Sequence, residues 1–385
     1  MRPIAAHVSR VERPMKVLHV YKDYDPPVHG GMERHMALMC RFQREWGNVE
    51  ALTCSRSLRS REILRDGTAV TEVGEWGRFQ NAPVSPMFPY YLRRKKADVV
   101  VVHVPNPTAE LAYLMSRPRG KLIVRYQSDV VRQAAAMKLY RPFLMKFLAK
   151  ADMILVASEQ YLSTSSVLQS FRDRCRVVPM GIVPEDFDPP AEARIASVRE
   201  SYGGRFVFFF GRHRYYKGLE HLVRAAERID ARVVIAGRGP ESSRLEMLAR
   251  LHGVKVEFPG TLTHEELVAH LHACELMVFP SVERSEAYGL AMLEAHACGK
   301  PVVATKLGTG VEFVNLDGET GLNVAPGDAE ALAEAVSSLL DDAALRDRLG
   351  ARARERVISD FDARQIARME YEIYEEVAAC SKTGI

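Results

Sequence analysis

The sequence has no hydrophobic run long enough to cross a membrane. Its longest apolar runs, such as Val99 to Val102 and Phe206 to Phe210, have the length of a β-strand. Residues 1–14 contain Arg2, Arg10, Glu12 and Arg13 but no apolar segment, so they do not resemble an export signal. We therefore expect a cytoplasmic protein whose first 14 residues form a flexible tail.

Cysteine is scarce, with six residues in a chain of 385. None of them forms a C-x-x-C pair, which argues against a zinc site or a disulfide-based scaffold. We expect reduced thiols that are mostly structural, as is usual in the cytosol. The cysteines stand at positions 40, 54, 175, 274, 298 and 380.

Size and charge favour two soluble domains of different character. A chain of this length exceeds the usual size of a single core. The net charge of +4 conceals an asymmetry. Residues 15–182 hold 26 Lys and Arg against 15 Asp and Glu, whereas residues 183–385 hold 24 against 33. The first half therefore suits an anionic partner, such as a phosphorylated acceptor or an acidic membrane surface. It contains no recognised nucleic-acid-binding module, so we expect no nucleic acid.

Apolar, strand-like segments alternate with helical patterns in both halves of the chain. This alternation predicts an α/β protein with two doubly wound, Rossmann-like domains that face a cleft. A segment rich in proline and acid after residue 177 places the boundary at residues 183–184, which gives domains of residues 15–183 and 184–361. The predicted strands lie near residues 16–21, 49–53, 99–104, 121–126, 153–157, 206–210, 232–236, 255–258, 276–280, 301–305 and 321–324.

The most informative stretch is residues 285–299, which follows one predicted strand and precedes another. Glu286 and Glu294 are eight residues apart, or about 12 Å at roughly 1.5 Å per residue along a helix. This separation is about the reach of a nucleotide sugar from ribose to hexose. Free N–H groups near Tyr288 and Gly289 can face a diphosphate. On spacing alone, Glu286 is equally a loop or cap residue and Glu294 a solvated helix position.

A second constellation follows the predicted strand Phe206 to Phe210. Arg212 and Lys217 lie in the loop before the next helix, where together they can neutralise a diphosphate without a metal. Basic loop residues of this kind are also commonly just solvated. Gly30 and Gly31 follow the first strand and either let the backbone approach a phosphate or form a plain turn.

Glu286 to Glu294, with Gly289 between them and residues 299–303 (GKPVV) after them, resembles the Glu-x7-Glu signature of family 4 retaining glycosyltransferases, which have the GT-B fold. The resemblance covers nearly all of residues 15–380. It implies that the second domain binds a nucleotide sugar, the first binds the acceptor, and a final helix in residues 362–385 crosses back to the first domain. The resemblance further implies that Glu294 binds the ribose and Glu286 the donor sugar, while Arg212 and Lys217 bind the diphosphate. Gly30 and Gly31 would lie on the phosphate side of the cleft, and the loop of Gly237 and Gly239 would lie beside the nucleotide. Further substrate contacts are implied for Ala287, Tyr288, Gly289 and Leu290.

One position departs from the family pattern. Many relatives that resemble this chain carry a His before Ser-Asp, and that His lies near the reacting sugar. Here Gln127 precedes Ser128 and Asp129. Gln cannot exchange a proton, but it can hydrogen-bond a sugar hydroxyl, so Gln127 is a catalytic candidate and Asp129 an acceptor-side candidate. His103 ends a strand before a proline loop and either lines the cleft or is structural.

We expect no metal and no cofactor. Asp-x-Asp triplets occur at residues 23–25, 186–188 and 360–362, and only the first follows a strand in the expected cleft. Arg212 and Lys217 already cover the diphosphate. Residues 86–96 and 137–150 mix cations with aromatic side chains, either as amphipathic segments packed on a sheet or as a peripheral face for anionic lipid.

The resemblance therefore predicts a retaining enzyme that moves a hexose to a lipid-linked or glycan acceptor in polysaccharide synthesis. GDP-mannose is the favoured donor, ahead of a UDP-sugar, because residues 128–133 resemble bacterial polysaccharide mannosyltransferases. Two alternatives stay open. One is a GT-B sugar-nucleotide epimerase, and the other is an inactive nucleotide-sugar-binding subunit, which Gln127 would suit.

Overall fold

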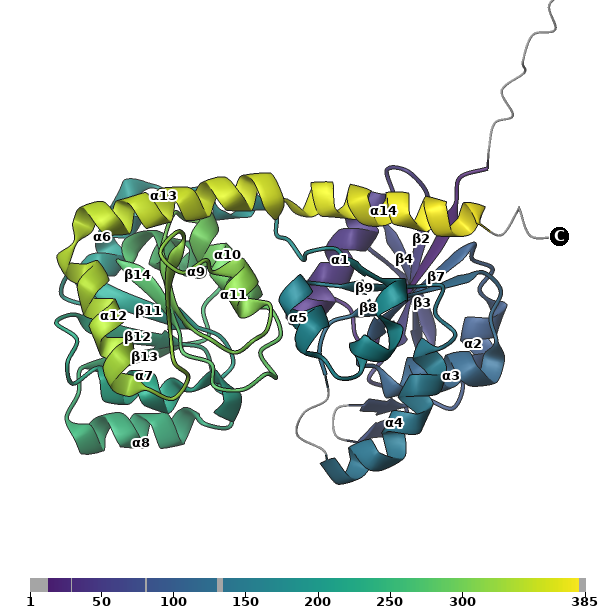
Figure 1. Ribbon diagram of the computed structural model, residues 1–385, viewed down its shortest axis with the longest axis horizontal. Coiled ribbons are helices and arrows are strands. Elements are labelled where there is room, and N and C mark those ends of the chain that lie inside the picture. The colour runs from purple at the N-terminus through teal and green to yellow at the C-terminus, as the bar shows by residue number, and fades with distance from the viewer. Residues whose placement is uncertain (1–12, 29, 80–81, 130–133, 381–385) are drawn as a thin grey trace, which may run out of the picture.

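The chain folds into two α/β units that lie side by side (Figure 1). The computed structural model describes residues 13–28, 30–79, 82–129 and 134–380. Most of the predicted N-terminal tail (residues 1–12), residues 130–133 and residues 381–385 lie outside the described residues. Each unit has its own sheet with helices on both faces, so the predicted fold class is confirmed.

The first sheet has the strand order β10-β9-β8-β7-β1-β2-β4-β3. Its central strand β7 (Val99–Val104) is buried at every position, as expected where helices cover both faces. The other strands are β1 (Lys16–Val20), β2 (Asn48–Cys54), β3 (Arg61–Arg65), β4 (Thr68–Val73), β8 (Lys121–Tyr126), β9 (Met153–Val156) and β10 (Cys175–Val177). The helices are α1 (Gly31–Gln43), α2 (Phe88–Arg94), α3 (Pro107–Ser116), α4 (Ala134–Leu148) and α5 (Glu159–Thr164), and a small hairpin is formed by β5 (Gly77–Phe79) and β6 (Ala82–Val84).

The first sheet also contains a strand that the sequence analysis did not predict, β3, which pairs antiparallel with β4. The two strands are joined at Asp66 and Gly67, both of which have positive φ (44° and 76°). Two adjacent residues with positive φ form the tight turn that suits a two-residue hairpin, and Asp-Gly is a favoured sequence for it.

The second sheet has the order β13-β12-β11-β14-β15-β16, and its neighbouring strands pair parallel. The order reverses between β11 and β14, so the loops after these two strands diverge and open a crevice. Its strands are β11 (Phe206–Phe210), β12 (Arg232–Ala236), β13 (Val256–Gly260), β14 (Leu276–Phe279), β15 (Val302–Thr305) and β16 (Gly321–Val324). Its helices are α6 (Glu192–Ser201), α7 (Leu219–Ala225), α8 (Ser242–His252), α9 (His264–Ala273), α10 (Leu290–Ala297), α11 (Val311–Val314), α12 (Ala329–Asp341) and α13 (Ala343–Asp360).

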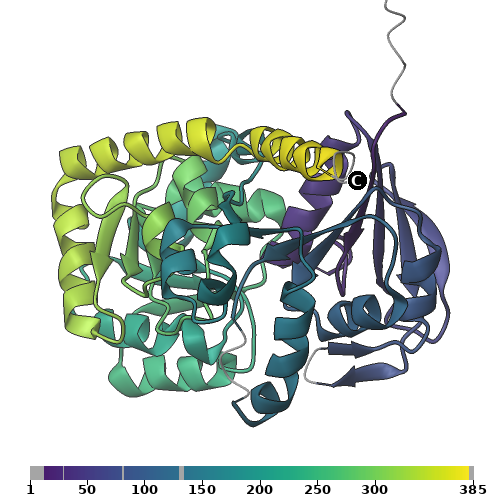
Figure 2. The same ribbon diagram turned by 45° about the vertical axis from the view of Figure 1, so that its right-hand side comes forward.

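The chain passes between the two units twice, and the two crossings are hydrogen-bonded to each other. The backbone N–H of Ile182 donates to the carbonyl of Phe361 (3.0 Å), and that of Ala363 donates to the carbonyl of Ile182 (2.8 Å). After the second crossing, α14 (Ala363–Ala379) lies along α1 of the first unit, as both views show (Figures 1 and 2). The buried face of α14 joins the core of the first sheet. The domain boundaries at residues 183 and 361 stay predictions.

We predict that Gly181→Ala destabilises the protein by about 1–3 kcal/mol, because a Cβ at Gly181 would lie 2.2 Å from the carbonyl oxygen of Phe361. Thermal unfolding measures the effect, with the exposed Ser163→Ala as the control. A variant as stable as the wild type would show that the two crossings can separate without cost.

Candidate functional site

A cleft of about 900 Å³ lies between the two units. Its walls are built from segments at the carboxyl ends of strands, which is where open α/β sheets bind ligands. The four catalytic candidates, Gln127, Arg212, Lys217 and Glu286, all line it. The first unit contributes parts of residues 22–41 and residues 127–128 among others, the second contributes parts of residues 210–217 and 285–294, and residues 180–182 join them.

Glu286 is held by two donors from its own unit. The Nζ of Lys217 lies 2.5 Å from Oε2 of Glu286, and the Ser281 hydroxyl donates to the same oxygen at 3.1 Å. Lys217 also lies over the ring of Phe279, 4.6 Å from its centroid. Both charged side chains are nearly buried. Two residues that the sequence assigned to different parts of a ligand therefore form one ion pair.

Glu294 is paired across the cleft with a residue that the sequence analysis missed. Nη1 of Arg34, on α1 of the first unit, lies 2.8 Å from Oε1 of Glu294 on α10. Burial raises the pKa of Glu294 above its ordinary value, and the charge of Arg34 opposes that rise. Arg34 also lies 3.7 Å from Asp186. The sequence signal that could have identified Arg34 was its position one helical turn after Gly30 and Gly31, because that turn begins a helix at the cleft.

The expected arrangement of Glu286 and Glu294 along one element needs correction. Helix α10 begins at Leu290, so only Glu294 lies on it and Glu286 belongs to the preceding loop. Gly289 stands before the helix with φ of 91°, where a Cβ would lie 2.5 Å from Cε of Met292. The first helical N–H groups are therefore those from Leu290 onwards.

Tyr288 lines the cleft, and its hydroxyl binds the backbone of Met180 in the same wall. Its buried hydroxyl donates to the carbonyl of Met180 (2.9 Å) and accepts from the backbone N–H of Met180 (3.1 Å). Ala287, beside it, packs against the core of the first unit. These two residues attach the loop of the second unit to the first crossing, while Gly289 and Leu290 also line the cleft.

Gly30 and Gly31 line the cleft as predicted and allow a close approach of α1. A Cβ at Gly30 would lie 2.3 Å from Oε2 of Glu33, and one at Gly31 would lie 3.1 Å from Cδ1 of Leu290. The side chain of Arg212 is exposed and lies on the same wall as Lys217. Gly31 therefore lets the two units approach each other beside these cations, while Gly30 leaves room for the side chain of Glu33.

The prediction that His103 lines the cleft is wrong. Its side chain is fully buried, and its Nδ1 is 3.1 Å from Nε2 of Gln127, which does line the cleft. Asp129 accepts hydrogen bonds from the hydroxyls of Tyr126 (2.7 Å) and Ser165 (2.9 Å) and is not among the described residues that line the cleft. His103 thus stands behind Gln127 rather than beside it.

Gly237 and Gly239 also lie outside the described wall of the cleft. A Cβ at Gly237 would lie 1.9 Å from the carbonyl oxygen of Gly211, and one at Gly239 would lie 2.3 Å from that of His213. Both glycines therefore serve close packing against the loop that carries Arg212.

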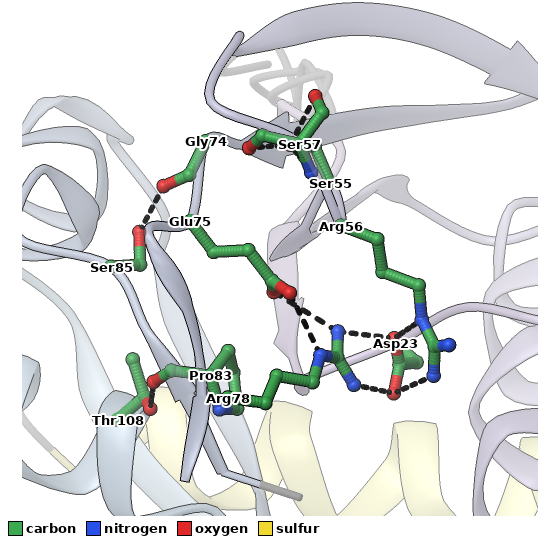
Figure 3. Close-up of polar contacts among 10 residues, drawn as sticks. All are labelled: Asp23, Ser55, Arg56, Ser57, Gly74, Glu75, Arg78, Pro83, Ser85 and Thr108. Carbon is green, nitrogen blue, oxygen red and sulfur yellow. Dashed lines mark hydrogen bonds and ion pairs between the residues drawn. The ribbon is translucent and has the colours of Figure 1, made fainter.

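A cluster of four charged residues lies at the cleft in the first unit, where Asp23, Arg56 and Arg78 line the wall and Glu75 binds Arg78 (Figure 3). The guanidinium of Arg78 binds both carboxylate oxygens of Asp23 at 2.7 Å and also binds Glu75 at 2.8 and 3.0 Å. Arg56 binds Asp23 at 3.1 and 3.4 Å. Burial acts to raise the pKa of Asp23, but the two arginines bring it below its ordinary value. Sequence analysis missed Arg56, Glu75 and Arg78.

The Asp23 carboxylate is therefore bound by two cations. Among the residues that the structure describes, no group of three or more His, Cys, Asp or Glu side chains could hold a metal ion. In the same residues, no helix is long and apolar enough to cross a membrane.

Comparison with known proteins gives matches over both units. The model of the glycosyl transferases group 1 family matches residues 192–356, and that of a glycosyl transferase 4-like domain matches residues 30–181. The D-rhamnosyltransferase WbpZ of Pseudomonas aeruginosa is 35% identical over 91% of this chain and 93% of that protein. The O-antigen chain mannosyltransferase C of Escherichia coli is 33% identical over 91% of this chain and 95% of that protein.

Solved structures share the fold over almost the whole chain. Sucrose-phosphate synthase from Thermosynechococcus elongatus superposes with a TM-score of 0.80 at 24% identity, over 95% of this chain and all of that one. HepE from Anabaena, in complex with UDP and glucose, gives a TM-score of 0.77 at 16% identity, over 94% of this chain and all of that one.

We predict that Arg78→Ala destabilises the protein by about 2–4 kcal/mol, because it leaves the buried Asp23 and Glu75 carboxylates without their main partner. Arg56→Ala should cost less than about 1 kcal/mol, because its side chain is 55% exposed. Urea unfolding of the two variants makes the comparison. Equal losses would contradict the central place given to Arg78.

Proposed function

Because the chain belongs to the group 1 glycosyltransferases, we propose that it moves a hexose from a nucleotide sugar to a glycan or lipid-linked acceptor in the synthesis of a cell-surface polysaccharide. The observation that carries this proposal is the pair of nearly buried carboxylates, Glu286 and Glu294, each held by a cation at one cleft. The second unit would hold the donor and the first unit the acceptor.

The reaction breaks the bond between the anomeric carbon of the sugar and the diphosphate oxygen, and forms one to the acceptor hydroxyl oxygen. The hydroxyl proton leaves with the departing phosphate. Arg212 and Lys217 would stabilise the charge that develops on the leaving diphosphate, and the closed cleft would fix the geometry. Attack on the face that the diphosphate leaves would retain the anomeric configuration, and no metal would be required.

Glu294 would bind ribose hydroxyls, and this binding would affect its ion pair with Arg34. Arg34 belongs to the first unit, so a ribose at Glu294 must share that carboxylate with Arg34 or displace it. Donor binding in the second unit is thereby coupled to the contact between the two units. In the same way, Glu286 would orient the donor sugar while Lys217 turns toward the diphosphate.

GDP-mannose is our first choice of donor. Of the relatives that match nearly the whole chain, one at 33% identity is a mannosyltransferase, which supports mannose, and one at 35% identity is a D-rhamnosyltransferase, which supports its 6-deoxy analogue. These two sugars differ by a single hydroxyl on C6. A UDP-sugar is the third possibility.

Two other functions remain testable alternatives. A sugar-nucleotide epimerase would convert the donor with no acceptor present. An inactive binding subunit would hold the donor without turning it over, and Gln127 at the position of the family's His is the observation that favours it.

We further propose that the first unit rests on an anionic membrane surface. Helices α2, α3 and α4 pack in succession beside the β5–β6 hairpin. Large apolar side chains are exposed on each, while Arg93 and Arg94 lie on α2 and Arg141 and Lys146 on α4. Exposed apolar groups beside cations suit the interface of an anionic bilayer. The apolar set comprises Trp76, Phe79, Tyr90, Met115 and Phe143.

The donor prediction is tested by thermal unfolding with GDP, UDP, ADP and their sugars, each with and without magnesium. A ligand at a hundred times its dissociation constant adds about 2.7 kcal/mol, which raises the melting temperature by several degrees. We expect this shift with the guanine series, independent of magnesium and lost in Glu294→Ala. If none of the nucleotides raised the melting temperature, the proposed function would be refuted.

The membrane prediction is tested by cosedimentation with phosphatidylcholine vesicles that contain or lack phosphatidylglycerol. Binding should require the anionic lipid, and the double variant R93S/F143S should weaken it by about fivefold or more. The matched control is R250S/M247S on α8, which removes an exposed cation and an exposed apolar residue from the second unit. Equal losses in both double variants would contradict the proposed face.

A further inference from the structure

Three polar side chains lie on one side of the first sheet, in adjacent strands. His19 is on β1, His103 is on β7, and Gln127 follows β8. Side chains alternate along a strand, so His19 and His103 share the side of Val17 and Val101. Those two valines belong to the core cluster that α1 and α14 cover. The polar side chains thus lie beneath the helix that returns from the second unit.

These side chains form a continuous line of hydrogen bonds. Nε2 of Gln127 is 3.1 Å from Nδ1 of His103, and Nε2 of His103 is 3.1 Å from Nδ1 of His19. Nε2 of His19 is 2.8 Å from Oε1 of Gln43, on α1. Nε2 of Gln43 is 3.4 Å from the carbonyl oxygen of Ala367, on α14. The line runs from the helix to the wall of the cleft.

Both imidazole rings of the line are neutral at physiological pH. His19 and His103 are completely buried. Burial lowers the pKa of His19 to about 4 and that of His103 well below its ordinary value. A neutral imidazole has one N–H and one lone pair, so each ring donates on one side and accepts on the other.

The carbonyl of Ala367 fixes the direction of the line, because it can only accept. Gln43 must therefore turn its amide N–H to Ala367 and its oxygen to His19. His19 must then carry its proton on Nε2 and accept on Nδ1, which requires His103 to carry its proton on Nε2 as well. Nδ1 of His103 is left as an acceptor, and Gln127 must turn its N–H toward it. The opposite direction would bring two carbonyl oxygens together at Ala367.

The outcome is a defined orientation for the side chain of Gln127. Its Oε1 is buried and has no hydrogen-bond partner among the residues that the structure describes. Gln127 is 4% exposed and lines the cleft together with residues 285–290 of the second unit. A buried carbonyl oxygen without a partner is unfavourable, and a hydroxyl donor in the cleft would satisfy it.

We propose that Gln43, His19 and His103 are positioning residues that hold the Gln127 amide in one orientation, so that its oxygen accepts a hydrogen bond from a hydroxyl of the transferred sugar. This inference rests on the proposed function. At the position of the family's His, Gln127 would accept a hydrogen bond from one hydroxyl of the transferred sugar without removing its proton. Donor choice at this position then depends on a helix, α14, that does not line the described part of the cleft.

The direction of the line is tested without any substrate by long-range ¹H–¹⁵N spectra of protein labelled with ¹⁵N-histidine. His19→Phe and His103→Phe assign the two rings. Both rings should be in the Nε2–H form at pH 7.5. An Nδ1–H form at either ring would overturn the fixed direction, whatever the enzyme does with donors.

The sugar contact is tested by competition between the natural donor and its singly deoxygenated analogues. The wild type should favour the natural donor in kcat/KM by about 10- to 100-fold over the one analogue that lacks the recognised hydroxyl. Gln127→Met should bring that ratio close to 1. His19→Phe and His103→Phe should lower it partly and leave the ratios for the other analogues unchanged.

The control is His270→Phe in the second unit, a nearly buried histidine outside the line. It should lower the melting temperature and keep the donor ratios of the wild type. Unchanged ratios in folded Gln127→Met would overturn the sugar contact, and unchanged ratios in both folded histidine variants would overturn the positioning role. A wild type that binds no nucleotide sugar would refute the proposed function instead, while the spectra still decide the direction of the line.

Discussion

The arrangement of the two units at the cleft depends on the buried carboxylate of Glu370, on α14. It lies 3.4 Å from Arg125 and 3.5 Å from His35, and all three side chains are inaccessible to solvent. Burial acts to raise the pKa of Glu370, but Arg125 and His35 keep it below its ordinary value. Arg125 then donates to the carbonyls of Val178 (2.8 Å) and Pro179 (2.9 Å). Because Met180 follows and binds Tyr288, the charge on α14 is linked to the loop that carries Glu286.

This linkage explains why the terminal helix returns to the first unit rather than ending on the second. A buried ion pair contributes little net stability, but loss of either partner is costly, so Glu370 and Arg125 determine where α14 can dock. The backbone bonds between the two crossings restrict the same region. Arg34 and Glu294 lie close to these crossings, because Arg34 is also 3.7 Å from Asp186, which follows the first crossing.

The sequence predicts the fold well because continuous apolar strands and their spacing are local signals. β7, β8, β11, β12 and β16 have the predicted bounds. The β3–β4 hairpin was missed because neither strand is a continuous apolar run, although Asp66-Gly67 signalled the turn. His103 was placed correctly at the end of β7, but the sequence did not decide whether it lines the cleft or is buried. In a strand that is buried on both faces, the apolar pattern does not distinguish the two faces.

Pairings between distant segments could not be predicted, because a pair of this kind leaves no local signal in the sequence. Arg34 with Glu294, and Arg78 with Asp23, join residues that are 260 and 55 positions apart. Arginine is frequent in the first half, and apart from the position of Arg34 after Gly30 and Gly31, no local pattern marks the few arginines that lie at the cleft. The cleft lining was therefore predictable where a motif fixes the backbone, as at Gly30, Gly31 and Glu286, and not where a long side chain reaches in from another element.

The ion pairs at the cleft change the interpretation of the uneven charge of the chain. Arg34, Arg56 and Arg78 belong to the basic first half, yet each is matched by a carboxylate at the cleft. The positive excess of that half is found in part on its outer surface, where α2 and α4 carry exposed cations. Arg212 and Lys217, which face the cleft, come instead from the acidic second half. On the proposed function, the field of the first unit would attract an anionic surface, while recognition of a diphosphate would depend on the two cations in the loop after β11.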